Sequence, residues 1–248
     1  MEISFQINGE TIKVDLNNPL DLSLPLVAGE NNVNAWYCDP VRIEPVRMGD
    51  WVGDVNQGGS VNFRNVFLNP HGNGTHTECV GHISKEHYSL NDELKTFFFL
   101  ASVVTLTPVT RGSDAVLTAE SIDQCTIHPA AQAIVIRTTP NGRDKVTKKY
   151  SNTNPAYVEA GLIHKLVDRG IEHLLIDLPS VDREKDQGRL EAHHAFWRYP
   201  EAPRRGATIT ELIYVPDSVA DGHYLLNLMI TSLENDASPS KPVLYRFF

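Results

Sequence analysis

Apolar and polar residues alternate in several short runs of the chain, which is the period of a β-strand with one buried face. Residues 2–7 alternate, Asn8 and Gly9 follow as a tight-turn pair, and residues 11–16 alternate again. This order predicts an N-terminal β-hairpin. Residues 61–68 also alternate, and we expect them to form a strand that ends just before His71.

Longer apolar runs predict the buried part of the fold. Three such runs each predict a strand: residues 97–109, 133–137 and 173–178. Pro108 lies near the end of the first run. Between the last two, Asn154 and Pro155 predict the start of a helix that ends at Gly170. The apolar stripe of this helix is formed by Val158, Leu162, Ile163 and Leu166. Strand, helix and strand make a βαβ unit, so part of the sheet is expected to be parallel.

The other segments are expected to be shorter or less regular. Strands are expected at residues 211–215, 224–230 and 243–247, and Thr118 is a plausible cap for a helix over residues 119–125. Residues 139–153, with Lys145, Lys148 and Lys149, are interpreted as a solvated connection. Residues 21–51 lack periodicity but carry several aromatics, which indicates an irregular functional region rather than disorder. Residues 1–248 are therefore expected to form one α/β domain.

Composition narrows the class of protein. The chain has 248 residues, of which 41% are hydrophobic and 21% charged, and its formal net charge is −9. An acidic chain is a poor partner for nucleic acid or an anionic membrane, and no apolar run approaches the length of a membrane span. The N-terminus lacks the pattern of a signal peptide, and the three cysteines have no paired spacing. We expect a cytoplasmic protein that acts on a small molecule.

Histidines and acids gather in residues 69–83. His71, His76 and His82 lie in this stretch with Glu78, and Gly72 and Gly74 allow the backbone to turn. Imidazole and carboxylate are the ligands of zinc and of other divalent transition metals. If residues 76–82 are extended, His76, Glu78 and His82 point to one face with Val80. The stretch therefore indicates a metal or catalytic site, and the alternative is a polar turn with incidental histidines.

A second group of candidate residues lies between positions 176 and 212. Asp177 follows a predicted buried strand, where sites of α/β proteins often form, although a capped turn would also explain it. His193 and His194 are adjacent and cannot both face one point on a regular element, so one of them is expected to be structural. The group comprises Asp177, Ser180, Asp182, His193, His194 and Glu211.

These two groups resemble the motifs of the cyclase family of metal-dependent hydrolases, which includes kynurenine formamidases and isatin hydrolases. The family signature reads His-x-Gly-Thr-His-x-Asp-x-Pro-x-His, and residues 74–76 and His82 match it. Three features differ: one extra residue follows His71, Glu78 replaces Asp, and Val80 replaces Pro. Similar family segments align with residues 176–182, with residues 192–194 and Glu211, and with residues 236–239.

The resemblance implies a fold, a cofactor and roles for residues. The fold would be the swivelling β/β/α type with a mixed sheet, and the cofactor one or two zinc ions, with manganese as the alternative. His71, His76 and Glu78 would hold one ion, and His82, His193 and Glu211 a second, with Glu78 bridging. His82 and Glu211 would also act in catalysis. Trp36 is a candidate for stacking on an aromatic substrate, and the structural roles fall to Asp177, Ser180, Asp182 and His194.

The expected activity is hydrolysis of a carbon–nitrogen amide bond, most like an arylformamidase that converts N-formylkynurenine to kynurenine and formate. The first alternative is a single-metal lactam hydrolase of the isatin type. The second is a small-molecule- or metal-binding protein that keeps the fold without activity. Because the resembled family is commonly dimeric, we also expect a homodimer or a larger homo-oligomer.

Overall fold

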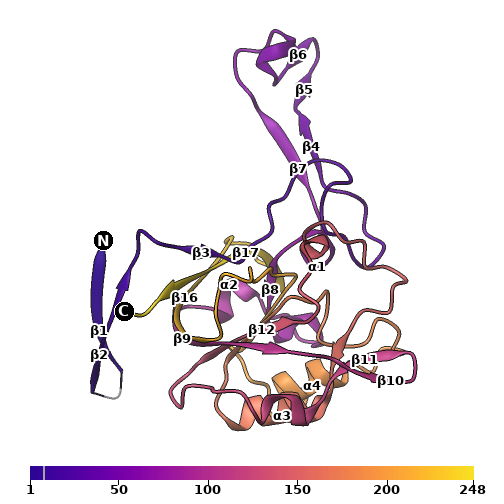
Figure 1. Cartoon of the computed structure of the whole chain (residues 1–248). Helices are drawn as coiled ribbons and strands as arrows, with labels where there is room; N and C mark the ends of the chain where they lie inside the picture. Colours follow the sequence, from indigo (N-terminus) through magenta and orange to yellow (C-terminus); the bar gives the residue numbers. More distant parts are fainter. Residues whose placement is uncertain (8) are drawn as a thin grey trace.

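A mixed sheet closes on itself at the centre of the molecule, in a computed structural model that describes residues 1–7 and 9–248 (Figure 1). The strand order is β16-β9-β12-β14-β15-β8-β17, and pairing of β17 with β16 closes the barrel. Strand β3 adds to β17 on the outside. The bounds are β3 Leu20–Asp21, β8 His76–Glu78, β9 Phe98–Leu106, β12 Ala133–Thr138, β14 His173–Ile176, β15 Thr208–Glu211, β16 Gly222–Ile230 and β17 Ala237–Arg246.

The parallel part of the sheet confirms the predicted βαβ unit. Strands β9, β12, β14 and β15 run parallel to one another, and every residue of β12, β14 and β15 is buried. Burial on both faces explains why these strands appear in the sequence as continuous apolar runs. In β12, Ile134 and Ile136 pack on the helix side, while Ala133 and Val135 face the core inside the barrel.

Two helices cover one side of the barrel (Figure 1). Helix α3 spans Ala160–Asp168 and α4 spans Glu191–Trp197. Residues 154–155 were predicted to start α3, and this was wrong, because Asn154 adopts a left-handed conformation with φ 47° and its N–H donates to Glu184. Strand β13 (Tyr157–Val158) then pairs with β11 before the helix begins. Gly170, with φ 82°, follows the end of α3 as predicted.

The N-terminal hairpin is confirmed for the described residues. Strands β1 (Glu2–Ile7) and β2 (Glu10–Asp15) pair antiparallel, and Gly9 of the predicted turn has φ 86°. Asn8, the other predicted turn residue, lies outside the described residues. The hairpin lies at one side of the barrel beside the C-terminus (Figure 1).

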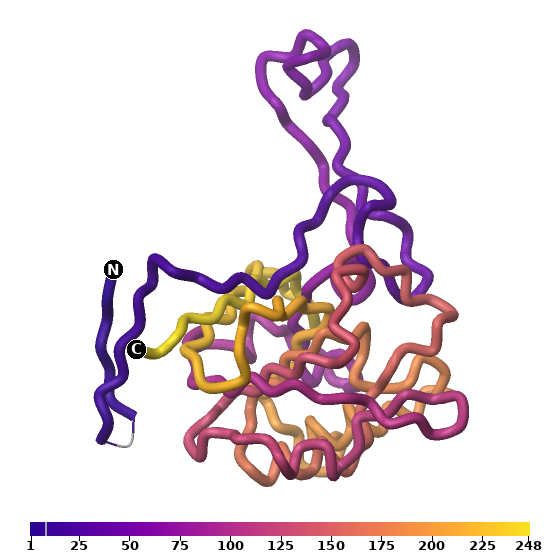
Figure 2. The backbone as a smooth tube through the Cα atoms, viewed as in Figure 1, coloured from indigo at the N-terminus to yellow at the C-terminus, as the bar shows by residue number. Residues whose placement is uncertain are grey.

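Residues 42–67 form an arm that projects from the barrel (Figure 2). Strands β4 (Arg42–Pro45) and β7 (Arg64–Phe67) pair antiparallel, and β5 (Arg47–Met48) pairs with β6 (Trp51–Val52) toward the tip. The irregular region expected over residues 21–51 is thus partly a hairpin. The strand expected over residues 61–68 is shorter and fully exposed. Several large apolar side chains on the arm are exposed to solvent: Met48, Val55, Val61, Phe63, Val66 and Phe67. The oligomeric state stays a prediction.

Several predicted boundaries were wrong for local reasons. The helix expected over residues 119–125 is a 3₁₀ turn, Ala119–Ile122, with Thr118 in a capping box. The strand expected at residues 211–215 ends at Glu211, because Leu212 has φ 54° and turns the chain out of the sheet. The remaining short elements are β10 Val109–Arg111, β11 Asp114–Leu117, α1 Pro70–Asn73, α2 Leu90–Glu93 and 3₁₀ turns at Val55–Gln57, Val80–His82 and Arg143–Val146.

Lys145 was expected in a solvated connection, and this was also wrong. Its side chain is buried, and Nζ lies 2.8 Å from Asp177 Oδ2. In the part of the chain that the structure describes, we find no helix with the length and apolar character that crossing a membrane requires.

Candidate metal centre

The stretch that carries the first histidines begins with a short helix. The side chain of Asn69 caps α1 by accepting a hydrogen bond from Gly72 N, and His71 lies in the first turn. Gly72 packs against Ala35 and Cys38 so closely that a side chain at this position would collide with them. The loop over residues 35–38 therefore fixes the position of α1 and, with it, of His71.

Strand β8 places His76 and Glu78 on one face. It pairs with β15 on one side and β17 on the other, so the barrel wall fixes its backbone. The predicted row of side chains was wrong beyond Glu78, because residues 80–82 form a 3₁₀ turn and Val80 packs in the core. This turn bends the chain back, and His82 Nε2 lies 3.8 Å from Glu78 Oε2.

The carboxylate of Glu78 lies at the centre of the site and is fully buried. Three imidazoles approach it: His71 Nδ1 at 3.0 Å, His193 Nε2 at 3.1 Å and His82 Nε2 at 3.8 Å. The rings of His71 and His82 stack with centroids 4.3 Å apart. Imidazoles from α1, from the 3₁₀ turn at Val80–His82 and from α4 therefore converge on the carboxylate that β8 carries.

Glu211 and His76 form the deeper side of the same cluster. His76 Nε2 lies 3.6 Å from Glu211 Oε2, and His193 Nε2 lies 3.9 Å from Glu211 Oε1. Val181 N donates a hydrogen bond to Glu211 Oε1 at 2.9 Å and fixes the carboxylate. The structure thus brings together all the residues that the sequence suggested as ligands: His71, His76, Glu78, His82, His193 and Glu211.

Asp182 orients His193. Its carboxylate accepts from His193 Nδ1 at 2.5 Å and from the backbone N–H groups of Ala192 and His193. Ser180 Oγ in turn accepts from Asp182 N. Because Nδ1 donates to Asp182, the Nε2 atom of His193 is turned toward Glu78. A carboxylate on the far nitrogen orients metal-binding histidines in the same way.

Three other predicted residues lie outside this cluster. His194 Nδ1 donates to the carbonyl of Tyr199 at 2.9 Å, so it is the structural member of the histidine pair. Asp177 accepts from Thr138 and Lys145. Trp36 is half-buried and packs beside Leu212, on the loop that holds α1. Its role as a substrate contact stays a prediction.

Asp236 is a site residue that the sequence reasoning missed. Its Oδ2 lies 2.9 Å from His71 Nε2 and 3.3 Å from His82 Nδ1. It directly precedes β17, whose Ala237 pairs with Glu78 in the sheet. A signal was present, because Asp236 begins the last segment that resembles the family, but nothing in its spacing indicated contact with the histidines.

The charges of the cluster are strongly coupled. Burial alone would lower the pKa of His71, but hydrogen bonds to Asp236 and Glu78 outweigh it and raise the pKa to about 10. Burial would raise the pKa of Glu78, yet the charge of His82 and the hydrogen bonds from His193 and His71 hold it well below its usual value. Burial would likewise lower the pKa of His193, but Asp182 and Glu78 raise it. The buried carboxylate thus requires positive charge around it.

The chemistry of the donor set fits a divalent cation. His76 Nδ1 donates to the carbonyl of Gly74 at 3.0 Å, so Nε2 carries the lone pair, and this buried atom has no hydrogen-bond partner among the described residues. Glu78 Oε2 is also buried, and imidazole nitrogens face it, His71 Nδ1 at 3.0 Å and His82 Nε2 at 3.8 Å. Three groups of side chains lie close enough together to hold a cation. They are His71 with His76 and Glu78; Glu78 with His82 and His193; and His71 with His82 and Asp236. A cation would satisfy these atoms and replace the protons that now hold the cluster together.

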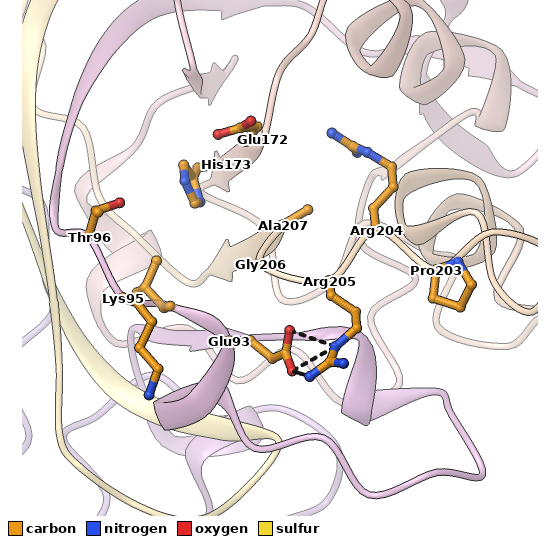
Figure 3. A pocket seen from close by; sticks show the side chains of 11 residues that line it. Glu93, Lys95, Thr96, Glu172, His173, Pro203, Arg204, Arg205, Gly206 and Ala207 are labelled. Atoms are coloured by element: carbon orange, nitrogen blue, oxygen red, sulfur yellow. Dashed lines mark hydrogen bonds and ion pairs between the residues drawn. The ribbon is translucent and has the colours of Figure 1, made fainter.

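A separate cavity of about 590 Å³ lies at the other end of the parallel strands and contains none of these residues (Figure 3). His173, which begins β14, and Ala207, which precedes β15, line it. The Arg205 guanidinium pairs with Glu93 at 2.6 Å in its wall. Since Glu211 stands at the opposite end of β15, this cavity is distinct from the histidine cluster.

Comparison with known proteins agrees with this geometry. A kynurenine formamidase of Bacillus cereus is 25% identical over 228 residues, covering 91% of this chain and 96% of that protein. One of Delftia acidovorans is 29% identical over 211 residues, covering 81% and 90%. An isatin hydrolase structure with the product analogue thioisatinate shares the fold, with a TM-score of 0.65, 16% identity and 92% coverage of each chain.

The family model described as putative cyclase matches residues 14–183. This range includes the stretch from His71 to His82, ends just after Asp182, and covers four of the seven barrel strands, β8, β9, β12 and β14. The predicted α/β fold with a mixed sheet is also the fold of a structure described as a potential metal-dependent hydrolase with cyclase activity, with a TM-score of 0.63 and 16% identity over 92% of this chain and 97% of that one. The chain belongs to the cyclase family.

Proposed function

We propose that the chain is a metal-dependent amidohydrolase that cleaves an aryl formamide of the N-formylkynurenine type. The names of the relatives from Bacillus cereus and Delftia acidovorans support the substrate class. The observation that carries the proposal is the buried Nε2 atom of His76, which has no hydrogen-bond partner among the described residues and lies 3.6 Å from Glu211 Oε2. Such an atom is costly unless a ligand satisfies it.

We propose two zinc ions, because the donors are imidazoles and carboxylates. His71, His76 and Glu78 would hold the first ion, while Glu78, His193 and Glu211 would hold the second. When bound, zinc would supply an activated water, since it lowers the pKa of bound water from 15.7 to about 7. The protein contributes a rigid frame, because β8 is paired on both sides and Asp182 orients His193.

His82 is the proposed proton carrier. Its side chain is 30% exposed, the most open of the imidazoles that face Glu78, so it can reach a bound substrate. Asp236 accepts from Nδ1, which leaves Nε2 free to take a proton from the attacking water. The same Nε2 atom would then deliver a proton to the leaving amine. Trp36 is the proposed contact for the aromatic part of the substrate.

The adjacent histidines provide a matched test. We expect His193→Gln to abolish hydrolysis of N-formylkynurenine and to lower metal content, because Nε2 of His193 faces Glu78 and Glu211. His194→Gln should keep both, because His194 faces the carbonyl of Tyr199. Full activity of His193→Gln, or equal loss in both variants, would contradict the proposal.

A second experiment separates the two possible roles of His82. In His82→Asn, metal content should stay at the wild-type level while hydrolysis falls by about 10²- to 10⁴-fold, the usual contribution of a proton carrier. Loss of metal in this variant would instead make His82 a ligand. Turnover of isatin in place of the formamide would assign the site to a lactam hydrolase, and turnover of neither substrate by the metal-loaded protein would indicate a binding protein.

A further inference from the structure

A cavity of about 490 Å³ lies at the carboxyl ends of three parallel strands, on the edge of the sheet at which Glu211 ends β15. Thr107 follows β9, Thr138 ends β12 and Leu178 follows β14, and all three line the cavity. None of the residues around Glu78 belongs to its wall. Since α/β proteins commonly bind ligands at this end of their parallel strands, the position is that of a ligand site.

The wall of the cavity is mainly apolar. Its volume and lining are those of a site for a small molecule, in which a few polar groups fix the orientation of an apolar ligand. The apolar part of the wall is contributed by Pro108, Ala115, Pro140, Pro155, Ala156 and Leu178. A ligand with an aromatic or aliphatic body would therefore be well accommodated.

Tyr150 supplies a hydrogen-bond donor in this wall. The residue is 4% exposed, and its ring packs with Leu24, Val33 and Leu212. Although the residue as a whole is buried, its hydroxyl lines the cavity, and within residues 1–7 and 9–248 it makes no hydrogen bond. Burial, with the charges of Asp177 and Asp144, raises the pKa of this hydroxyl, so it remains protonated. A donor that faces a cavity without a protein partner is available to an acceptor on a ligand.

Two charged side chains of opposite sign also line the cavity, Lys148 and Asp144. The ammonium of Lys148 lies over the Tyr150 ring, 5.3 Å from its centroid. Lys145, by contrast, is already satisfied, because its Nζ donates to Thr138 O, Thr138 Oγ1 and Asp177. The groups available to a ligand are therefore one hydroxyl donor, one cation and one carboxylate.

We propose that this cavity is a second ligand site, for a small molecule with an apolar body and a carboxylate that accepts from the Tyr150 hydroxyl and the Lys148 ammonium. Simple carboxylic acids and apolar α-amino acids share this chemistry. Asp144 favours the amino acid, because its carboxylate lines the same cavity and would pair with an ammonium group.

Titration calorimetry with the purified full chain tests the proposal, with 3-phenylpropionate, L-phenylalanine and the uncharged 3-phenylpropanamide as probes. Both acids should bind, and the amide should bind at least about tenfold more weakly, since a hydrogen bond to a charged group contributes about 1.5–3 kcal/mol. Tighter binding of L-phenylalanine than of 3-phenylpropionate identifies amino acids as the ligands, while equal binding identifies simple acids.

Variants locate the bound acid. Tyr150→Phe removes the hydroxyl and keeps the ring, so the protein should retain its thermal stability and bind the acids about tenfold more weakly. Lys148→Met should weaken binding about threefold, while Lys149→Met, whose side chain instead faces Glu30 and Asn32, should bind normally. His76→Ala should also bind normally, because the metal centre is separate from the cavity.

Three results would overturn the proposal. The first is the absence of binding of either acid at millimolar concentration. The second is equal affinity for the acid and the amide, or for wild type and Tyr150→Phe. The third is loss of binding in His76→Ala together with full binding in Tyr150→Phe, because the acid would then occupy the metal centre.

Discussion

Replacing Lys145 with methionine removes the cation that faces the buried carboxylate of Asp177. The two groups are 2.8 Å apart, and the side chain of Lys145 is 10% exposed and that of Asp177 fully buried. Breaking a buried pair by removing one partner costs about 3–5 kcal/mol, because it leaves an uncompensated charge. At about 2–4 °C per kcal/mol for a chain of this size, the expected fall in Tm is at least about 6 °C.

The loss should depend on pH. Burial raises the pKa of Asp177, while Lys145 and Thr138 oppose the shift. Without Lys145 the pKa of the carboxyl rises further above its unfolded value. A carboxyl with a raised pKa binds more protons in the folded state, so its stability is greatest at low pH and is lost as the pH rises through the folded pKa. The penalty of Lys145→Met should therefore be largest near neutral pH and shrink on acidification.

Urea unfolding at pH 7 and at pH 5 measures both effects. Lys95→Met is the matched control, because Lys95 pairs with Asp92 at an exposed site and should change the free energy of unfolding by less than about 1 kcal/mol. The double variant Lys145→Met/Asp177→Asn should recover part of the loss, since no buried charge remains. A cost below about 1 kcal/mol for Lys145→Met, or one that grows on acidification, would refute this reasoning.

Three further predictions concern other buried groups. The pKa of His173 is lowered to about 3 by burial and by the charge of Arg204, so the unfolded state binds the proton first and stability is lost as the pH falls below about 6.5. The free energy of unfolding should fall by about 2 kcal/mol between pH 6.5 and pH 5 for this reason. Urea unfolding of His173→Gln should not show this fall, and an unchanged dependence on pH would contradict the prediction. Asp182→Asn should weaken metal binding about 10- to 100-fold in a competition assay with a chelator, and unchanged affinity would show that the Asp182–His193 contact is not needed. Asp236→Asn should lower kcat/KM about 10- to 100-fold, and equal loss in the exposed control Glu234→Gln would count against a specific role.

Much of the fold was predictable because local pattern and burial coincide. The runs at residues 97–109, 133–137 and 173–178 became β9, β12 and β14, since strands buried on both faces are apolar throughout. The ligand candidates were predictable because His71, His76, Glu78 and His82 are close in sequence. His193 and Glu211 were candidates in their own segment, and their assignment as ligands of the same site came from the resemblance, which links segments distant in sequence.

The remaining features depend on contacts between distant segments. Asp236 reaches His71 and His82 only because β17 pairs with β8. Lys145 is buried because it pairs with Asp177, which is 32 residues away in the sequence. The residues next to Asp177 do not indicate that an amine lies beside it. The left-handed conformations of Asn154 and Leu212 moved the boundaries of α3 and β15. None of these has a periodic signal in the sequence.

The metal content of the purified protein, counted per chain by elemental mass spectrometry, tests the central claim most directly. Glu78 belongs to both proposed ligand groups, so Glu78→Gln should weaken both ions together. We expect about two zinc ions per chain in the wild type, one for each donor group, and far less zinc in Glu78→Gln. A wild-type protein that holds no divalent metal even after the metal is added back, or a Glu78→Gln variant with undiminished content, would contradict this claim.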